Sequence, residues 1–463
     1  MEEKLFFYYT NDLHSHFENW PAIIGHFEAE KAIRKKNGQS YWLVDIGDHV
    51  DLSHPISEAL KGKANVELLN RSGFNVATIG NNEGITLDYD QLYHLYDHAE
   101  FQLLCANLES MKEPDPLWLQ HTTQLISDKG TKIGVIGLTA PFNAIYNLVG
   151  WNISPPLEVL DRYIPKLAAE NDIVVLLSHL GIHDDEEIAK RYNDIDVIIG
   201  GHTHHLFRDG EEVSGTLLTA AGKHGKYIGE VILTWDQNRK ELTKKEAYAT
   251  SVENFPSHPG TEELLANFNQ QANEVLDKPV THLNTNLEFG WFKETPIMTK
   301  FVDTLREWTD ADCAMLNAGV LLDRFDKGNV TYGDIHRICP HPMNPCVVKL
   351  TGSELIEVVR VALSKQFMEL KLKGFGFRGE VIGRMVFSGM EVKTTKGPDG
   401  HERVSEVTMD GKQIEPDKEY YVATVDTFTL GRLLPEVARS EYKKFYMPEF
   451  IRDLLTHTLK YKF

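Results

Sequence analysis

The first half of the chain contains short, nearly continuous apolar runs, each ending in polar or glycine-rich residues. Such runs suit strands that are buried on both faces. Because helical stretches lie between several of the runs, the pattern predicts a layered α/β domain. The runs are Leu5–Tyr9, Trp42–Ile46, Val76–Ile79, Ile133–Leu138, Ile173–Leu177 and Val197–Ile199, with further strand-like segments at Thr216–Ala220 and Tyr227–Trp235. The helical stretches include Pro55–Ser72, Tyr89–Ala99, Leu157–Glu170 and Asp184–Tyr192.

The length of the chain and one turn-rich segment predict two domains. A chain of 463 residues is longer than one ordinary domain. The segment Phe255–Gly260 is rich in turn-forming residues, and Thr261 after it can cap a helix that runs to about Asp277. We expect a first domain over residues 1–251, a connecting helix within 252–281 and a second, mixed α/β domain over 282–463. The second domain is expected to contain helices at Pro296–Trp308 and Ser353–Lys371 and strands at Val347–Leu350, Gly389–Thr394, Val404–Met409 and Glu419–Thr424.

The charge of the chain restricts its partners. A formal net charge of -20 disfavours passive binding to nucleic acid or to an anionic membrane. An anionic substrate then needs a local positive site, and bound metal ions are one way to make it. The segment Met1–Lys4 lacks the features of a signal peptide, and no run approaches the roughly 18 apolar residues that span a bilayer. We therefore expect a cytoplasmic protein without nucleic-acid or membrane partners.

The four cysteines show no metal-binding or redox spacing. They are far apart, without a CxxC pair, which favours reduced and buried thiols. A pairing of Cys339 with Cys346 stays open at this point. The cysteines are Cys105, Cys313, Cys339 and Cys346.

Potential metal ligands follow five of the apolar runs. Asp12 and His14 stand two residues apart, a spacing that puts both side chains on one side of an extended segment. Ligand sites in open α/β sheets gather beyond the carboxyl ends of the strands. Neighbouring glycines let the backbone turn sharply enough to bring short side chains to one point. The residues after the runs are Asp12 and His14, then Asp48, then Asn81, then His179, and finally His202 and His204.

The chemistry of these residues predicts a site for two divalent metals. Carboxylate, imidazole and amide ligands together suit Mn²⁺, Zn²⁺, Fe²⁺ or Co²⁺ better than Mg²⁺ or Ca²⁺. Two such ions roughly 3.5–4 Å apart can lower the pKa of a bridging water and hold a phosphoryl oxygen. The neighbours Asp45, His49, His183 and His205 are expected to have supporting or structural roles.

These motifs resemble those of the calcineurin-like metallophosphoesterases and, among them, the bacterial 5′-nucleotidases and UDP-sugar hydrolases. The motifs are Thr10-Asn11-Asp12-Leu13-His14, Gly47-Asp48, Gly80-Asn81-Asn82-Glu83, Ser178-His179-Leu180-Gly181 and Gly200-Gly201-His202-Thr203-His204. The resemblance implies a four-layered α/β/β/α first domain and a smaller α/β C-terminal domain that recognises substrate. It also implies that a hydroxide between the metals attacks phosphorus. By the same resemblance, Asp12, His14 and His204 bind the first metal, Asp48 bridges, and Asn81, His179 and His202 bind the second.

The chain departs from this family where a catalytic histidine is usual. The family reads Gly-Asn-His-Glu or Gly-Asn-His-Asp, whereas this chain has Asn82 in the histidine position. An amide donates a hydrogen bond but no proton near neutral pH. Either another histidine (His16, His49 or His205) replaces it, or the leaving group needs little acid help, or turnover is poor. The residues expected in catalysis are Asn81, Asn82, Glu83 and His16.

The second domain resembles the 5′-nucleotidase C-terminal domain, with departures in the substrate-binding motifs. Its matches include Leu316-Asn317-Ala318-Gly319 and Val330-Thr331-Tyr332-Gly333-Asp334. Leu322 occupies the slot of a phosphate-binding arginine, for which Arg324, two residues on, is a candidate substitute. Phe428 is a candidate either for base stacking or for the core. The residues expected to contact substrate are Asn317, Gly319, Arg324, His341, Phe428 and Arg432, with Arg378 and Arg384 as further phosphate-binding candidates.

The sequence therefore predicts a dinuclear metal-dependent hydrolase of nucleotides or nucleotide derivatives, including anhydrides such as UDP-sugars. Two alternatives stay open. One is a metal- and nucleotide-binding sensor with little or no activity, which Asn82 and Leu322 favour. The other is a nuclease with the same type of metal site, which the net charge of -20 disfavours.

Overall fold

The chain folds into two compact units. The computed structural model describes residues 2–372, 374, 376–396, 402–431 and 433–463. The units are Met1–Ala272 and Asn273–Phe463, and each is described by itself. The chain passes from one to the other within helix α9 (Pro259–Leu276), which lies where a helix from Thr261 to about Asp277 was predicted. The role of this helix as a connector stays a prediction.

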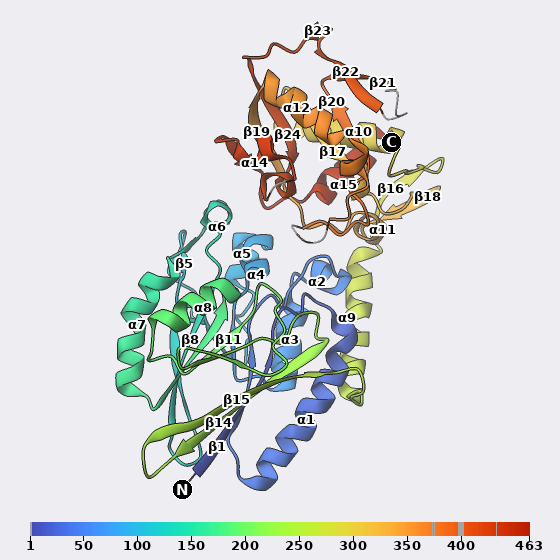
Figure 1. Ribbon diagram of the computed structural model, residues 1–463. Coiled ribbons are helices and arrows are strands. Elements are labelled where there is room, and N and C mark those ends of the chain that lie inside the picture. The colour runs from blue at the N-terminus through green and yellow to red at the C-terminus, as the bar shows by residue number, and fades with distance from the viewer. Residues whose placement is uncertain (1, 373, 375, 397–401, 432) are drawn as a thin grey trace. The chain divides into compact units, whose positions relative to one another are not determined.

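Two β-sheets form the centre of the first unit (Figure 1). One has seven strands in the order β15-β14-β1-β2-β3-β4-β6, and the other has six in the order β12-β13-β11-β10-β8-β7. The strands of the first sheet are β15 (Glu241–Ser251), β14 (Tyr227–Asp236), β1 (Glu2–Thr10), β2 (Tyr41–Asp45), β3 (Val76–Thr78), β4 (Gln102–Leu104) and β6 (Leu119–Gln120). Those of the second are β12 (Glu211–Val213), β13 (Thr216–Thr219), β11 (Val197–Gly200), β10 (Ile173–His179), β8 (Lys132–Thr139) and β7 (Thr122–Ile126). A separate pair is β5 (Leu108–Ser110) with β9 (Trp151–Ile153).

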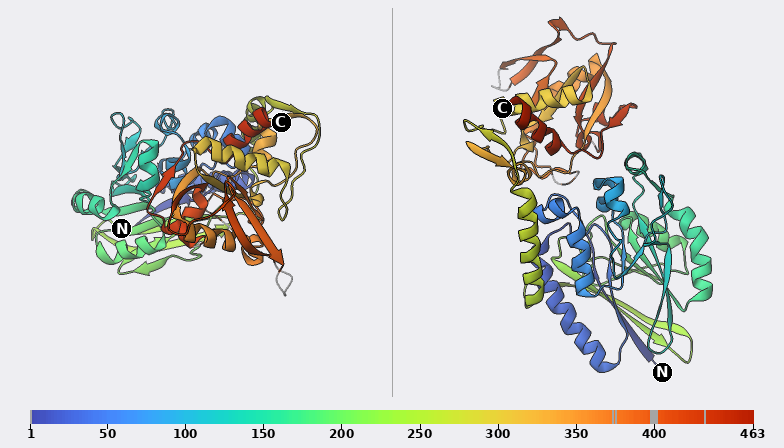
Figure 2. Two further views of the ribbon diagram at one scale, coloured as in Figure 1. Left: turned by 90° about the horizontal axis from the view of Figure 1, so that it is seen from above. Right: turned by 180° about the vertical axis from the view of Figure 1, so that it is seen from behind.

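The apolar runs are buried because both faces of their strands are covered. Alternate side chains, such as Phe7 and Val44 of the first sheet and Val175 of the second, pack in one cluster between the sheets. The opposite face of the six-stranded sheet packs on helices, as Ile136 does against Leu160 and Ile164. On the outer face of the seven-stranded sheet, the Tyr8 ring lies against Phe27 of an N-terminal helix. Helices therefore cover both outer faces (Figure 2), and the predicted four-layered α/β/β/α architecture is confirmed.

The helices of the first unit differ in detail from the expected ones. The predicted helix over Pro55–Ser72 is broken, because Lys61 and Gly62 have left-handed backbone angles of φ 49° and φ 78°. The predicted helix from Tyr89 ends early, at Tyr93. The helices are α1 (Trp20–Asn37), α2 (Pro55–Leu60), α3 (Lys63–Ser72), α4 (Asn81–Thr86), α5 (Tyr89–Tyr93), α6 (Asn143–Val149), α7 (Pro156–Glu170) and α8 (Ile182–Arg191).

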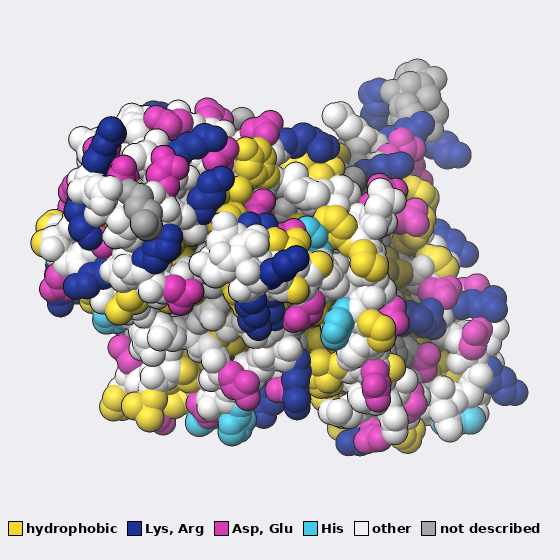
Figure 3. Space-filling view, turned by 90° about the horizontal axis from the view of Figure 1, so that it is seen from below, with side chains coloured by type: hydrophobic (Ala, Val, Ile, Leu, Met, Phe, Trp, Pro, Cys, Tyr) yellow, Lys and Arg dark blue, Asp and Glu magenta, His cyan; other side chains and the backbone are white. Residues whose placement is uncertain are grey.

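The surface residues drawn in Figure 3 carry charges of both signs. On the face drawn in Figure 3, Lys and Arg side chains are interspersed with Asp and Glu and form no continuous basic band among the described residues. Across the described ranges, we find no helix that combines the length and apolarity needed to cross a bilayer. All four cysteines are free and buried, so Cys339 and Cys346 do not pair.

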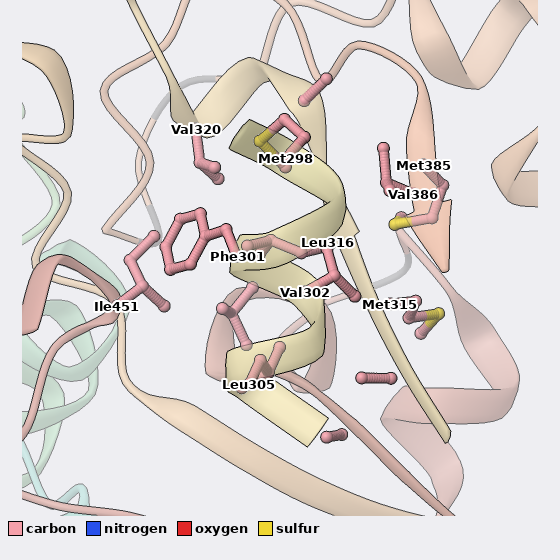
Figure 4. Close-up of a cluster of buried hydrophobic side chains, with 14 of the residues drawn as sticks. Met298, Phe301, Val302, Leu305, Met315, Leu316, Val320, Met385, Val386 and Ile451 are labelled. Atoms are coloured by element: carbon pink, nitrogen blue, oxygen red, sulfur yellow. The ribbon is translucent and has the colours of Figure 1, made fainter. Parts of the chain in front are cut away.

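The second unit is built on a five-stranded sheet with the order β20-β17-β24-β19-β25. Met298, Phe301 and Leu305 of α10 pack in its core with side chains from the sheet and from α15 (Figure 4). The predicted helix over Ser353–Lys371 is two helices, α12 and α13. The helices are α10 (Pro296–Thr309), α11 (Tyr332–Ile338), α12 (Gly352–Ala362), α13 (Lys365–Met368), α14 (Pro435–Arg439) and α15 (Ile451–Lys462). The strands are β16 (Pro279–Leu283), β17 (Cys313–Asn317), β18 (Gly328–Thr331), β19 (Pro345–Thr351), β20 (Met385–Ser388), β21 (Glu391–Lys396), β22 (Glu402–Met409), β23 (Lys412–Gln413), β24 (Glu419–Val425) and β25 (Lys443–Phe445).

Candidate metal centre

The predicted metal ligands come from the carboxyl ends of strands in both sheets of the first unit. Strands β1, β2 and β3 run parallel in one sheet, and β10 and β11 run parallel in the other. Their ends therefore point to the same edge of the layered structure, where ligand sites of such sheets form. All seven predicted ligands lie there, each within hydrogen-bonding or ion-pairing distance of at least one other.

Several residues at this edge have strained backbone angles of the kind that cluster at functional sites. Five of the seven predicted ligands have a positive φ: Asp12 (50°), His14 (50°), Asp48 (50°), His202 (69°) and His204 (59°). Such angles cost a non-glycine residue on the order of 1–3 kcal/mol each, and they persist only where surrounding contacts enforce them. Backbone bonds between loops provide this enforcement: Asp12 N–H donates to Gly47 O, and His14 N–H donates to Asp48 O at 2.8 Å.

Asp12, His14 and His204 form a first cluster, whose ligand atoms all lie within 4.8 Å of one another. The Nε2 atoms of His14 and His204 are 3.1 Å apart, and His204 Nε2 is 3.5 Å from Asp12 Oδ1. Asn11 donates through Nδ2 to Asp12 Oδ2 at 2.7 Å, which fixes the carboxylate.

Asp48, His179 and His202 form a second cluster of the same kind. Asn81 belongs with it, because its Oδ1 atom is 2.7 Å from His202 Nδ1. Asp48 also joins the two clusters: its Oδ2 is 3.6 Å from His14 Nε2, and its Oδ1 is 3.3 Å from His179 Nε2. One carboxylate thus presents a different oxygen to each cluster, an arrangement that suits a bridging ligand.

The donor atoms fit divalent cations. His179 Nδ1 is 2.7 Å from the carbonyl of Ile46, and its buried Nε2 has no hydrogen-bond partner within the described part of the chain. Donation from Nδ1 to the carbonyl leaves the Nε2 lone pair for a metal. Burial lowers the pKa of His202 to about 4 and that of His204 to about 3, so both rings are neutral ligands at neutral pH.

The shared carboxylate is ionised. Although burial opposes its charge, His179 and His14 hold the pKa of Asp48 below its usual range. Burial likewise opposes a charge on His179, but the carboxylates of Asp48 and Asp12 raise its pKa to about 10. These carboxylates therefore attract positive charge to the centre, which a metal ion supplies with release of the proton.

Glu83, which was expected in catalysis, holds the loop that carries Asp48. Its side chain is 1% exposed. Oε2 accepts from the N–H groups of Gly80 and Asp48, and Oε1 accepts from Val50 N–H at 2.8 Å. With both oxygens bound to backbone, Glu83 is a positioning residue and not one that faces the clusters.

Asn82 and His16 lie beside the first cluster. Asn82 Nδ2 is 2.9 Å from His14 Nδ1, and Asn82 N–H donates to Asp48 Oδ1 at 2.8 Å. The exposed His16 ring stacks on His224 with 3.7 Å between ring centroids. The His224 ring in turn lies edge-on to His14 at 5.8 Å.

Sequence reasoning missed His224. Its N–H donates to Asp12 O at 2.8 Å, and its φ is 62°. It follows β13, a parallel neighbour of β11, so a survey of the end of that strand would have found it. The other two histidines proposed in place of Asn82 are less suitably placed. His49 is buried with its ring against Trp20, and exposed His205 contacts Thr203.

Most residues predicted to bind substrate in the second unit are part of its own core, which corrects the expectation. Asn317 donates to Ile382 O, and His341 contacts Val320 O through Nε2 and accepts Arg378 N–H through Nδ1. Phe428 is 1% exposed and lies in the apolar core, as its alternative interpretation had it.

The other predicted residues of this unit are placed as follows. A Cβ at buried Gly319 would lie 2.0 Å from the carbonyl oxygen of Val381, so the glycine allows a close backbone approach. Arg324 is half-exposed and pairs with Asp326, Arg384 pairs with Glu402, and Arg432 lies outside the described residues.

The chain matches known proteins over nearly its full length. Residues 7–206 match the calcineurin-like phosphoesterases, and residues 277–432 match the 5′-nucleotidase C-terminal domain. An uncharacterized metallophosphoesterase of Bacillus subtilis, YunD, is 43% identical over 99% of this chain and 100% of its own length. The chain belongs to the 5′-nucleotidase family of metallophosphoesterases.

Solved structures share the fold of this metallophosphoesterase. A putative 5′-nucleotidase from Staphylococcus aureus has a TM-score of 0.72 at 19% identity, with 99% of this chain and 97% of that chain covered. The NAD nucleotidase of Haemophilus influenzae has a TM-score of 0.69 at 16% identity, with 99% and 96% covered. The comparisons confirm the predicted family and the predicted folds of the metallophosphoesterase domain and of the C-terminal domain. They also confirm the assignment as a phosphoric ester hydrolase. The family uses divalent metals, for which the two clusters are plausible sites.

Proposed function

We propose that this metallophosphoesterase hydrolyses phosphate esters or anhydrides of nucleotides at a centre for two divalent metal ions. The observation that carries the proposal is Asp48, whose two oxygens face different ligand clusters. When bound, Mn²⁺, Zn²⁺, Co²⁺ or Fe²⁺ ions would supply positive charge for the phosphoryl oxygens and make a water nucleophilic near neutral pH. The proposed ligands are Asp12, His14 and His204 for one ion, Asn81, His179 and His202 for the other, and Asp48 for both.

The preferred bond in this proposal is an anhydride. Asn82 cannot protonate a leaving oxygen, and general acid help is worth roughly 10²–10⁴-fold. The ring of buried His49 lies against Trp20, and His16 stacks on His224, whose ring lies edge-on to His14. A leaving phosphate or nucleotide phosphate needs less protonation than an alkoxide. The name of the NAD nucleotidase among the structural neighbours is consistent with such a substrate.

Phe142 offers a surface for the organic part of a nucleotide. The residue precedes α6, is 39% exposed, and has its ring centroid 5.7 Å from that of His202. In the following helix α6, Tyr146 is buried against Gly84 of α4. This contact holds α6 beside the candidate metal centre. An apolar ring in this place can pack on a base or sugar while the phosphate lies at the metals.

A sensor without turnover is the second candidate. Asn82 and Leu322 stand where the family has a catalytic histidine and a phosphate-binding arginine, and neither position is a proposed metal ligand. A nuclease is less compatible with the net charge of -20 and with the mixed charges on the face in Figure 3.

The test is a hydrolysis screen of the full chain with Mn²⁺, Zn²⁺ and Co²⁺ in turn. The substrates are nucleoside mono-, di- and triphosphates, NAD, UDP-sugars, cyclic nucleotides and single-stranded DNA. We expect metal-dependent turnover, faster on anhydrides than on alkyl monoesters, and its loss in Asp48→Asn. Glu3→Gln is the matched control, because Glu3 is a buried carboxylate bonded to Thr131 at the far end of β1.

The outcomes separate the candidates. Nucleotide binding by metal-loaded protein with no turnover on any substrate would establish the sensor. Equal rates on anhydrides and alkyl monoesters would refute the leaving-group preference. If His16→Ala leaves the rate unchanged, His16 is not a substitute acid.

A further inference from the structure

The ring of His14 has two differently occupied edges. Its Nε2 atom faces the first cluster and lies 3.8 Å from Asp12, 3.6 Å from Asp48 and 3.1 Å from His204. Its Nδ1 atom faces away from the cluster, with Asn82 Nδ2 at 2.9 Å and Asp51 Oδ2 at 3.5 Å. The second edge is therefore lined by an amide and a carboxylate that belong to no cluster.

A neutral imidazole binds a metal through one nitrogen only when its proton sits on the other. For His14 to bind through Nε2, the proton must be on Nδ1 and needs an acceptor there. A carboxylate oxygen accepts hydrogen bonds, so Asp51 Oδ2 is suited to accept a proton from Nδ1. In the structure Asn82 presents Nδ2 to this edge, and its Oδ1 accepts from Asn81 Nδ2 at 3.4 Å. The amide must therefore turn over to accept the same proton, which its nearly symmetric shape allows.

Asp51 is held rigidly for this contact. Its side chain is 3% exposed, its Oδ1 accepts from Ser53 N–H at 2.8 Å, and its own N–H donates to Ser15 Oγ at 2.8 Å. Ser15 directly follows His14, and its hydroxyl also accepts from Ser57 and Asn65. A buried polar network therefore ties the carboxylate to the segment that carries the imidazole.

Asn82 is fixed from a different side. Its backbone N–H donates to Asp48 Oδ1 at 2.8 Å, and its backbone carbonyl accepts from Thr86 Oγ1 within α4. Asn82 thus contacts the shared carboxylate through its backbone and the rear edge of His14 through its side chain. This contact gives the amide a task in the place where the family has a histidine.

We propose that Asp51, together with Asn82, is a positioning residue for the first metal cluster. Both keep the Nδ1 proton on His14 and thereby direct the Nε2 lone pair toward Asp12 and His204. The inference rests on the proposed function insofar as the clusters bind metal, but it does not depend on turnover. It assigns no proton transfer to Asn82.

The test measures metal binding and not only activity. Mn²⁺ and Co²⁺ are titrated into metal-free protein by calorimetry, the bound ions are counted by elemental analysis, and the visible spectrum of bound Co²⁺ reports the ligand set. We expect the wild type to bind two ions. In Asp51→Asn one of the two should bind roughly 10–100-fold more weakly, with an altered Co²⁺ spectrum, while the other keeps its affinity.

Further variants keep the inference falsifiable if Asp51→Asn folds poorly. Asn82→Ala should lower the affinity for the same ion. Asn82→Asp, whose carboxylate can accept from Nδ1, should bind that ion more tightly than Asn82→Ala does. Glu3→Gln is again the control and should bind both ions as the wild type does. The melting temperature of each metal-free variant shows whether the fold is intact.

Wild-type affinity for both ions in Asp51→Asn and Asn82→Ala would overturn the inference. An equal loss of affinity for both ions, together with a lowered melting temperature, would also overturn the inference, because that result shows a general structural role. If the wild type binds two ions but hydrolyses nothing, the proposed function fails while these affinities still decide the positioning role.

Discussion

One methyl group added at Gly80 should disable the metal centre. Gly80 precedes Asn81 at the end of β3 and packs against the loop after β2. A Cβ at this position would lie 2.1 Å from Asp48 Oδ1 and 2.2 Å from Asp48 N, where ordinary contacts begin at 3.4 Å. The backbone angle of Gly80 is φ -89°, which alanine adopts without strain, so the effect of Gly80→Ala is steric.

The magnitude follows from the displacement. The methyl group and Asp48 must separate by about 1 Å, and a shift of this size at a reacting centre can cost about 10²-fold in rate. Overpacking of a rigid site also costs about 1–3 kcal/mol of stability. Because Asp48 serves both clusters, we expect weaker binding of both ions and a kcat/KM reduced about 100-fold or more.

The assay combines counting of bound ions, kcat/KM with saturating Mn²⁺, and thermal melting. Gly333→Ala is the matched control, since a Cβ there meets its nearest atoms at the ordinary distance of 3.4 Å. This control should keep the wild-type rate and metal content. Gly80→Ala with wild-type metal affinity and kcat/KM would refute the assignment of Asp48 as the shared ligand.

Four further predictions address other parts of the chain. Phe428→Ala should destabilise the second unit by about 3–5 kcal/mol in urea unfolding, because the ring is 1% exposed; a raised nucleotide KM at unchanged stability would contradict this. Chelation by EDTA should abolish hydrolysis and lower the melting temperature, because metals bind the native fold, and Mn²⁺ should restore both; persistent activity would exclude metal dependence. Burial raises the pKa of Asp426 to about 7 from 3.8, so its stabilising contribution is full below pH 4 and is lost as the pH rises through 7. The melting temperature of Asp426→Asn should therefore rise relative to that of the wild type as the pH increases from 4 to 7. Parallel plots of melting temperature against pH for the two proteins would contradict the raised pKa. Phe142→Ala should raise KM for nucleotides by roughly 5–100-fold, as expected for a lost stacking contact, but not for inorganic pyrophosphate; equal changes would argue against a base-contacting role.

The corrections in the second unit show where sequence reasoning failed. The motif around Asn317 and the aromatic Phe428 matched a substrate-binding pattern by residue type. In the fold, however, Asn317 Nδ2 and both ring nitrogens of His341 bond to backbone groups from other segments and therefore do not face a ligand site. A residue type indicates what a side chain can bind, but burial determines whether a ligand can reach it.

The sequence by itself predicted the residues that gather at the candidate metal centre. Apolar runs mark buried strands, and the polar residues at their ends follow within a few positions, so this information is local. The family resemblance then added the layer order, which the structure shows. The break at Lys61 and Gly62 was missed, although glycine is a residue type that commonly ends a helix with left-handed backbone angles.

Only the tertiary structure decided how these ligands are arranged and supported. The contacts of His14 with Asn82, of Asp48 with His179, and of His16 with His224 join residues 68, 131 and 208 positions apart by subtraction of their numbers. Such contacts are set by the order of strands within one sheet and by the packing of the two sheets, not by local spacing. The same reason applies to Asp51, which became a candidate only when the fold placed it behind His14.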